Sequence, residues 1–444
     1  MNGLSWISII RLGLVQTALG AMVLLMTSTM NRVMTVELKL LAILPGSLVA
    51  LHHAVQIARP KWGYNSDMGG RRTPWIIGGL ATLAFGVFLS SVATAWMSIA
   101  LINGVLLAVV AYLLIGMGVG AAGTSLLAML AAKVAPARRA PAATIVWLMM
   151  IVGFIVTSKT AGPYLDPFTT TRLMMVTGTT VAIAFFVAVL AVWGVEDSVW
   201  SQPTESQEDK PSFSEAFREI WAEPKARAFT VFVFASMVAY STQDLILEPF
   251  GGLVFGMTPG ESTSMSGDQN KGVFFGMIFV AIAAGGANGG RWGSVRLWTI
   301  LGCVASGLVL FVLTLSAFSP DWPLRNLVMA LGFSNGIFAA AAIGWMMGLA
   351  GEGRSSREGV RMGLWGGAQA IGFALGGFLG TVGVDVVRFA SGSSVLAYAS
   401  VFAAEGALFL VAAALAFRMQ PSQSVRSTAD QQSAPAFGAA ELSS

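Results

Sequence analysis

The fold of this 444-residue chain is decided by one short loop, Gly63-Tyr64-Asn65-Ser66-Asp67-Met68-Gly69-Gly70-Arg71-Arg72. The loop has the pattern G-x-x-x-D-x-x-G-R-R and lies between two apolar stretches that are each long enough to cross a bilayer. Gly63 and Gly70 permit tight turns, because glycine tolerates backbone angles that other residues avoid. Arg71 and Arg72 add the positive charge that is typical of cytoplasmic loops in membrane proteins. The loop therefore predicts a membrane protein with this segment on its inner surface.

Composition places the whole chain in a membrane. Hydrophobic residues make up 55% of it and charged residues only 11%, whereas a soluble domain has roughly 25% charged residues. Because a helix needs about 20 apolar residues to cross the hydrocarbon core, we predict an all-α integral membrane protein with twelve transmembrane helices. The predicted spans lie near residues 9–30, 39–58, 74–95, 101–131, 141–163, 173–194, 228–251, 272–290, 294–318, 325–350, 361–384 and 394–417. The only cysteine, Cys303, excludes a disulfide framework and a metal site built on thiolates.

The distribution of basic residues predicts the orientation. If both termini lie in the cytoplasm, most of the 26 Lys and Arg residues fall on the inner side. Few basic residues then remain outside, among them Arg32, Lys39 and Lys271. The net charge of +4 therefore reflects topology and an anionic lipid surface, and we expect no nucleic acid partner.

Changes in composition predict the division of the chain. The polar and acidic stretch 196–227 is expected to be a cytoplasmic linker. It would join an N-terminal six-helix bundle, residues 1–195, to a C-terminal six-helix bundle, residues 228–420. Residues 421–444 are rich in Ser, Gln and Ala and predict a disordered cytoplasmic tail.

The opening loop resembles the loop signature of the major facilitator superfamily, a class of membrane carriers built from two six-helix bundles. The resemblance implies a conformational lock made of Gly63, Asp67, Gly70, Arg71 and Arg72. In that lock the aspartate faces the positive end of the eleventh span, and the arginines hold the inner ends of the bundles together in the outward-facing state. The sequence departs from the usual pattern at the residue after the aspartate, where a methionine replaces a common arginine.

Further blocks resemble the PucC/LhaA family, a branch of that superfamily in phototrophic bacteria. They are the stretches 29–38 (TMNRVMTVEL), 51–56 (LHHAVQ) and 59–77. The resemblance implies a multi-pass protein of the bacterial inner (intracytoplasmic) membrane that handles bacteriochlorophyll during light-harvesting complex assembly. It also implies light-harvesting antenna or reaction-centre polypeptides and pigment-synthesis enzymes as partners. Some members carry the older label of a bacteriochlorophyll synthase chain.

The two histidines of the chain, His52 and His53, are adjacent in the second predicted span. A buried, neutral imidazole is a good axial ligand for the magnesium of a chlorin, so one of them is a candidate pigment ligand. Gln56, one helical turn further on, is a candidate partner that fixes the ring orientation. Adjacent helix positions point in different directions, so at most one histidine is expected to face a given pigment. The alternative is that both are polar packing residues bonded to neighbouring helices.

Four charged residues are expected inside predicted spans, where ionisable side chains are candidates for function. They are Glu405, Asp244, Glu248 and Lys159. A proton-coupled carrier would use such carboxylates, but they also serve as hydrogen-bonding groups between helices. Both readings stay open.

Enzymatic chemistry is not supported by any motif. A membrane prenyltransferase would need paired aspartates to hold magnesium and diphosphate, and no two aspartates here have the D-x-x-x-D spacing. The chain also lacks a Walker A loop and a dinucleotide fingerprint. We therefore expect a non-enzymatic protein that binds and delivers bacteriochlorophyll or a late precursor. The alternatives are a proton-coupled carrier of an amphipathic small solute and a non-transporting scaffold for antenna assembly.

Overall fold

The computed structural model describes residues 4–58, 71–135, 138–196, 221–284, 293–319, 321–351 and 358–419. Twelve long α-helices account for nearly all of these residues. A helix satisfies every backbone hydrogen bond within its own segment, which is why apolar stretches of this length adopt it in a bilayer. The predicted all-α fold with two six-helix bundles is confirmed.

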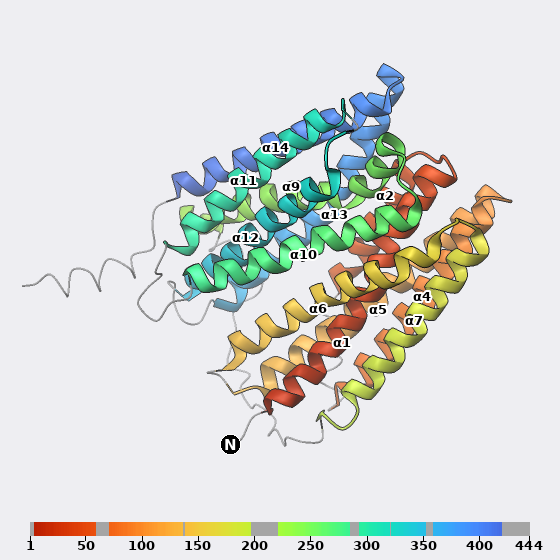
Figure 1. The fold of residues 1–444 in the computed structure, drawn as a ribbon. Coiled ribbons are helices and arrows are strands. Elements are labelled where there is room, and N and C mark those ends of the chain that lie inside the picture. The colour runs from red at the N-terminus through yellow and green to blue at the C-terminus, as the bar shows by residue number, and fades with distance from the viewer. Residues whose placement is uncertain are drawn as a thin grey trace, which may run out of the picture.

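The N-terminal half forms one bundle, drawn from red to yellow in the lower right of Figure 1. Its first helix continues through two wide π-type segments to Glu37. The helices are α1 (Trp6–Leu24, continued by η1, Leu25–Met30, and η2, Val33–Glu37), α2 (Ile43–Val55), α4 (Thr73–Met97), α5 (Leu101–Lys133), α6 (Arg139–Ala161, followed by the short η5, Gly162–Leu165) and α7 (Thr170–Val192).

The C-terminal half forms the second bundle, drawn from green to blue in the upper left of Figure 1. Its helices are α9 (Pro224–Phe255), α10 (Pro259–Ala284), α11 (Val295–Ser316), α12 (Leu324–Gly351), α13 (Glu358–Ser391) and α14 (Ser394–Arg418). We call the side of the membrane at which α1 begins the inner side, following the predicted orientation.

The two bundles repeat one packing scheme. In the first half α1 packs against α6 and α7, and α4 packs against α5. In the second half α9 packs against α13 and α14, and α11 packs against α12, so each first-half helix has a counterpart six spans later. Close packing depends on small residues, because a Cβ atom on Gly376 of α13 would lie only 2.4 Å from the Val238 carbonyl oxygen of α9. The scheme is an internal repeat, with each half built from six spans in the same order.

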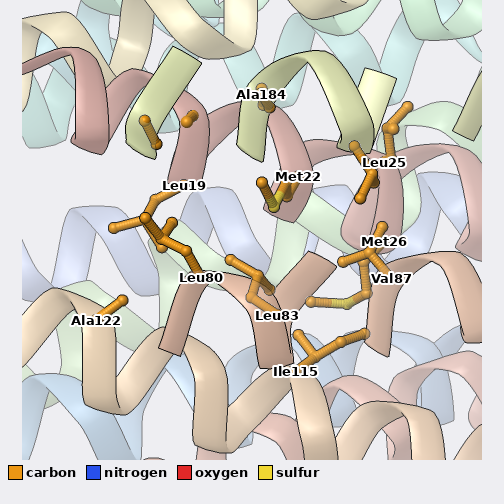
Figure 2. Packing of buried hydrophobic residues seen from close by; sticks show 14 of the residues in the cluster. Leu19, Met22, Leu25, Met26, Leu80, Leu83, Val87, Ile115, Ala122 and Ala184 are labelled. Carbon is orange, nitrogen blue, oxygen red and sulfur yellow. The ribbon is translucent and has the colours of Figure 1, made fainter. Parts of the chain in front are cut away.

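Apolar side chains fill the centre of each bundle. In the first half Leu19 and Met22 of α1 meet Leu80 and Leu83 of α4 and Ile115 of α5, as Figure 2 shows. These side chains are buried and leave the lipid-facing surfaces to other apolar residues. Polar residues inside the bundles are therefore exceptions in an apolar interior.

Two helices differ from the sequence prediction. Helix α2 has only 13 residues, and α10 is too polar to qualify as a span by hydropathy, so ten helices of the described chain pass that test. Helix α10 begins at Pro259, whereas the eighth span was predicted to begin at residue 272. Lys271, which was expected on the outer side, therefore lies inside a helix. The start of α10 carries no apolar signal because its residues are polar, and several of them contact the other half.

Several predicted segments lie outside the described residues. They are 197–220 of the predicted linker, the predicted tail 421–444 and the loop residues Gly63, Asp67 and Gly70.

Candidate functional site

The halves join at their outer ends through a polar stretch of the first helix. Leu25–Met30 and Val33–Glu37, on either side of Asn31 and Arg32, form π-type segments, a helix variant that is frequent at functional sites. Here Asn31 donates to the Leu245 carbonyl oxygen of α9 at 2.6 Å. Arg32, only 2% exposed, donates to the Met257 carbonyl oxygen at 2.6 Å and pairs with Glu37 at 2.5 Å. Both bonds to the second half come from one pair of neighbouring residues.

A buried carboxylate extends this contact. Glu248 of α9 accepts hydrogen bonds from Ser28 in the first half and Ser266 on α10. The two serine oxygens are 3.0 Å apart, and beside them the hydroxyls of Thr29 and Thr263 are 3.3 Å apart. The candidate residue Glu248 is therefore a bridge between the halves. Such a bridge stays intact only while the outer ends are closed.

A second outer contact involves α6 and α10. Lys159, another candidate from the sequence, forms an ion pair with Asp268 at 2.7 Å and donates to the Ser264 hydroxyl at 3.0 Å. Above it, Asp166 accepts from the Thr258 hydroxyl at 2.6 Å and from the Gly260 backbone N–H at 3.1 Å. All of these contacts cross from the first half to the second.

A third contact joins α2 to α13, where the Ile43 backbone N–H donates to Asp385 at 2.7 Å. Close by, a Cβ atom on Gly46 would lie 2.0 Å from the Thr381 hydroxyl, so the helices touch directly. We use the term outer closure for the residues that make the three contacts: Ser28, Thr29, Asn31, Arg32, Ile43, Lys159, Asp166, Leu245, Glu248, Met257, Thr258, Gly260, Thr263, Ser264, Ser266, Asp268 and Asp385.

The inner loop is bonded differently. The carboxylate of Glu196 accepts the backbone N–H groups of Arg72 at 2.7 Å and Thr73 at 2.8 Å, at the start of α4. Arg72 also donates to the Ala128 carbonyl oxygen at 3.0 Å, and Lys133 donates to the Glu196 carbonyl oxygen. Burial raises the pKa of Glu196, but these backbone donors outweigh it and hold the pKa below its usual value. These described bonds all stay within the first half.

The lock predicted for Arg71 and Arg72 belongs to the outward-facing state, whereas this structure is closed on its outer side. The role of these two arginines in joining the halves stays a prediction.

The two histidines have different surroundings. His52 is 2% exposed, and its Nε2 lies 2.8 Å from the Gln56 side-chain nitrogen, so the pair is part of the packing of α2. His53 is half-buried and stacks on Phe373 of α13 with ring centres 6.1 Å apart. Phe373 in turn meets Tyr240 of α9 edge to face at 5.8 Å. His53 is therefore the histidine that faces the other half.

The candidate Asp244 lies near this aromatic group. It sits four residues before Glu248 on α9, and residues four apart share a helix face. Because Glu248 contacts Ser28 of the other half, Asp244 also points toward that half, one turn further from the outer end. Its side chain is exposed, so accessible space lies there between the halves. Tyr240 precedes it by one more turn and adds an aromatic ring to the same face.

Glu405 of α14 is the remaining candidate. It is 3% exposed, and neither carboxylate oxygen has a hydrogen-bond partner within the described residues. It is close enough to Asp244 for the two charges to interact. The structure thus places two of the predicted charges, Glu405 and Asp244, near each other, and the other two, Glu248 and Lys159, in the outer closure.

The arrangement brings one imidazole and two further aromatic rings together where the halves meet. Aromatic rings of His53, Phe373 and Tyr240 provide faces for a macrocycle, and an imidazole nitrogen suits a metal carried by that ligand. In the described part of the chain no group of three or more His, Cys, Asp or Glu residues is placed to hold a metal ion on its own. Any metal here would be held by the ligand and one side chain.

Sequence reasoning missed most of the outer closure. Asn31 and Arg32 were noted as part of a family block and as an outer charge, but not as a bridge between the halves. The available signal was that the first predicted membrane-spanning helix carries two adjacent polar residues, Asn31 and Arg32, near its outer end. Asp268 and Glu196 gave no such signal, because each lies in a stretch that reads as a polar loop.

Comparison with known proteins decides the family. The family model described as PUCC protein matches residues 29–424. The chain belongs to the PUCC protein family. The chain is 52% identical over 413 residues to the bacteriochlorophyll synthase 44.5 kDa chain of Rhodobacter capsulatus, covering 93% of this chain and 95% of that protein. It is 29% identical to Protein PucC of Rhodovulum sulfidophilum, covering 86% of this chain and 85% of that one.

The fold of this PUCC family member is shared with solved carriers. A D-xylose-proton symporter aligns with a TM-score of 0.66 at 15% identity, over 93% of this chain and 97% of that one. At this identity the likeness concerns the fold alone. It confirms the major facilitator architecture of a multi-pass membrane protein.

Proposed function

We propose that this protein binds bacteriochlorophyll, or a late precursor, and delivers it during assembly of light-harvesting or reaction-centre complexes. Membership of the PUCC family supports a role in photosynthesis, and the name of the 52% identical relative supports a link to this pigment. The observation that carries the proposal is the placement of His53 against Phe373, which in turn contacts Tyr240, where the two halves face each other.

His53 is assigned as the axial ligand of the pigment magnesium. The macrocycle would lie along the rings of Phe373 and Tyr240, where offset stacking of flat apolar surfaces is favourable. His52 and Gln56, which are paired with each other, would position α2 and thereby orient His53. The bound pigment brings its own magnesium, so the protein supplies one nitrogen donor and an apolar surface.

The outer closure gives the delivery a direction. Since the structure is closed at the outer end, pigment would enter and leave from the inner side or sideways from the bilayer. That side faces the cytoplasm if both termini are cytoplasmic, as the basic residues predict. The recipients would be antenna or reaction-centre polypeptides in the inner (intracytoplasmic) membrane, and pigment-synthesis enzymes would be the donors.

The protein is not proposed to be an enzyme, although a relative is named a synthase chain. Magnesium and diphosphate chemistry needs clustered carboxylates, and the described residues contain no such cluster. The pair Asp244 and Glu405 has one exposed and one buried member, which does not suit a shared metal ion.

The first test is the absorption spectrum of the protein purified in mild detergent from a pigment-producing host. It is recorded beside a double variant, His52→Leu/His53→Leu. We expect bound bacteriochlorophyll in the wild type and loss or a spectral shift in the variant. Unchanged pigment in the variant would disprove histidine ligation. A wild-type protein without pigment would disprove pigment binding and favour a carrier or scaffold.

A second candidate function is a proton-coupled carrier of an amphipathic small solute. It is favoured by the buried carboxylate of Glu405, which lacks a hydrogen-bond partner among the described residues, beside the exposed Asp244. Coupled carriers use intramembrane carboxylates of this kind. In this case Glu405→Gln and Asp244→Asn would abolish solute flux into proteoliposomes. Wild-type flux in both variants would exclude coupling through these residues.

A further inference from the structure

The contact between α6 and α10 contains three charges that take no part in the proposed pigment site, although two of them belong to the outer closure. Asp268 of α10 lies 2.7 Å from Lys159 of α6 and 3.3 Å from Lys271 of α10. One carboxylate is thus shared by two ammonium groups, and one of these belongs to each half. We call Lys159, Asp268 and Lys271 the seam triad.

The seam triad faces the lipid side of α10. Ser266 marks the inward face of this helix, because it bonds Glu248 of α9. Gly272 marks the face toward α12, because a Cβ atom there would lie 2.1 Å from the Met329 carbonyl oxygen. The remaining face carries Phe275, 57% exposed, and Ile282, 68% exposed. Lys271, one turn before Phe275, lies on that exposed face, and its side chain is 40% exposed.

The seam triad lies close to the outer surface of the membrane. Lys159 is in the last turn of α6, immediately before η5. Tyr164 in η5 is exposed, as is usual for aromatic residues at a membrane interface. The flexible stems of both lysines allow their ammonium groups to extend toward that interface. Lys159 is therefore within reach of an anionic group in the outer headgroup layer. Lys271 lies 12 residues after the start of α10 and would approach the same group by extending its stem.

The seam triad keeps one uncompensated positive charge. Two ammonium groups face one carboxylate, and the other acids nearby are engaged elsewhere. Asp166 accepts from Thr258 and Gly260, and the Glu261 carboxylate accepts from the Thr258 backbone N–H at 3.0 Å. A charge at a lipid-facing position is costly unless it has a partner. A negatively charged group from outside the described chain would balance this charge.

We propose that the seam triad binds the phosphate of an anionic phospholipid and that this binding stabilises the outer closure. The phosphate would contact Lys271 of the second half and Lys159 of the first, so it would add one more bridge between them. The negative charge of the lipid phosphate would balance the extra positive charge of the seam triad. The acyl chains of the lipid would lie on the apolar face of α10 at Phe275. This site is separate from the proposed pigment site and does not depend on it.

The test compares thermal unfolding of the full-length protein in two kinds of nanodisc. One contains only phosphatidylcholine and the other contains equal parts of phosphatidylcholine and phosphatidylglycerol. The variant is Lys271→Gln, which leaves the Lys159–Asp268 pair intact and is therefore expected to fold. Lys225→Gln, an exposed lysine at the inner end of α9, is the matched control for general attraction to anionic lipid.

We expect phosphatidylglycerol to raise the Tm of the wild type and of Lys225→Gln equally. Lys271→Gln should lose more than half of that rise. An equal rise in wild type and Lys271→Gln, or no rise in the wild type, would overturn the proposal. Inorganic phosphate added to phosphatidylcholine discs should give no comparable rise. A full rise with free phosphate would show that the seam triad binds the anion and not the lipid.

Discussion

The outer closure and the inner cluster, formed by Glu196 with Arg72, Thr73 and Lys133, are both polar. The outer closure connects the two halves, whereas the described bonds of the inner cluster connect helices of one half. In the outer closure, Arg32 and Ser28 of the first half bond Met257 and Glu248 of the second. In the inner cluster, the described bonds of Glu196 run to the start of α4 and to α5 within the first half. The comparison indicates that the outer contacts stabilise the closed arrangement of the two halves, whereas the described inner contacts stabilise the first half alone.

Removing the buried guanidinium of Arg32 should cause the largest loss of stability. Arg32→Met deletes the bond to the Met257 carbonyl oxygen and leaves Glu37 without its ion pair. Arg32 is buried but Glu37 is 29% exposed, so the loss should lie near the lower end of the roughly 3–5 kcal/mol that is typical of breaking a fully buried pair. Thermal unfolding in detergent should show this loss, while Arg325→Met, at an exposed position, should change stability by less than about 0.5 kcal/mol. Equal effects of the two substitutions would contradict the structural role of Arg32.

A smaller effect is expected from the Glu248 bridge. Glu248→Ala leaves the buried hydroxyls of Ser28 and Ser266 without their acceptor, which costs about 1–3 kcal/mol. The outer ends should separate more often, and a disulfide between Thr29→Cys and Thr263→Cys, in a Cys303→Ser background, should form less readily.

Glu248→Gln keeps an acceptor oxygen and is the matched control for that experiment. Cross-linking should be nearly as efficient in it as in the background protein. If Glu248→Ala cross-links as efficiently as the background, Glu248 does not hold the outer ends together.

The inner cluster should show the smallest effect and a dependence on pH. Because the pKa of Glu196 is lowered in the folded protein, its stabilising contribution is present above the unfolded pKa of about 4.3. That contribution is lost as pH falls through the folded value. Glu196→Gln should therefore be less stable than the wild type by about 1 kcal/mol at neutral pH. The difference should shrink below about pH 4. A difference that does not change with pH would show that the charge is unimportant.

Much of the fold was predictable from apolar length and turn residues. Helices such as α4 and α14 lie within a few residues of their predicted spans, because their interiors are apolar and their ends are marked by polar residues. The start of α10 was missed because residues 259–271 are polar, and hydropathy does not register that Asp268 and Ser266 have partners across the interface, Lys159 and Ser28. Such partners are known only once the two halves are placed together.

The candidate site was predictable in residue type but not in role. Intramembrane charge alone marked Glu248 and Lys159, yet their contacts show bridges between the halves. The His52–His53 pair could be named from the sequence, but only the position of Phe373 distinguishes the two rings. The lock loop around Asp67 lies outside the described residues, and its role stays a prediction.

The central claim is that His53 holds the pigment between the halves while His52 supports α2. The most direct measurement is the amount of bacteriochlorophyll per protein in purified His53→Leu and His52→Leu single variants, with the wild type as reference. We expect His53→Leu to lose most of the pigment and His52→Leu to retain most of it with its absorption maximum unchanged. Full retention in His53→Leu, or loss only in His52→Leu, would show that His53 is not the pigment ligand.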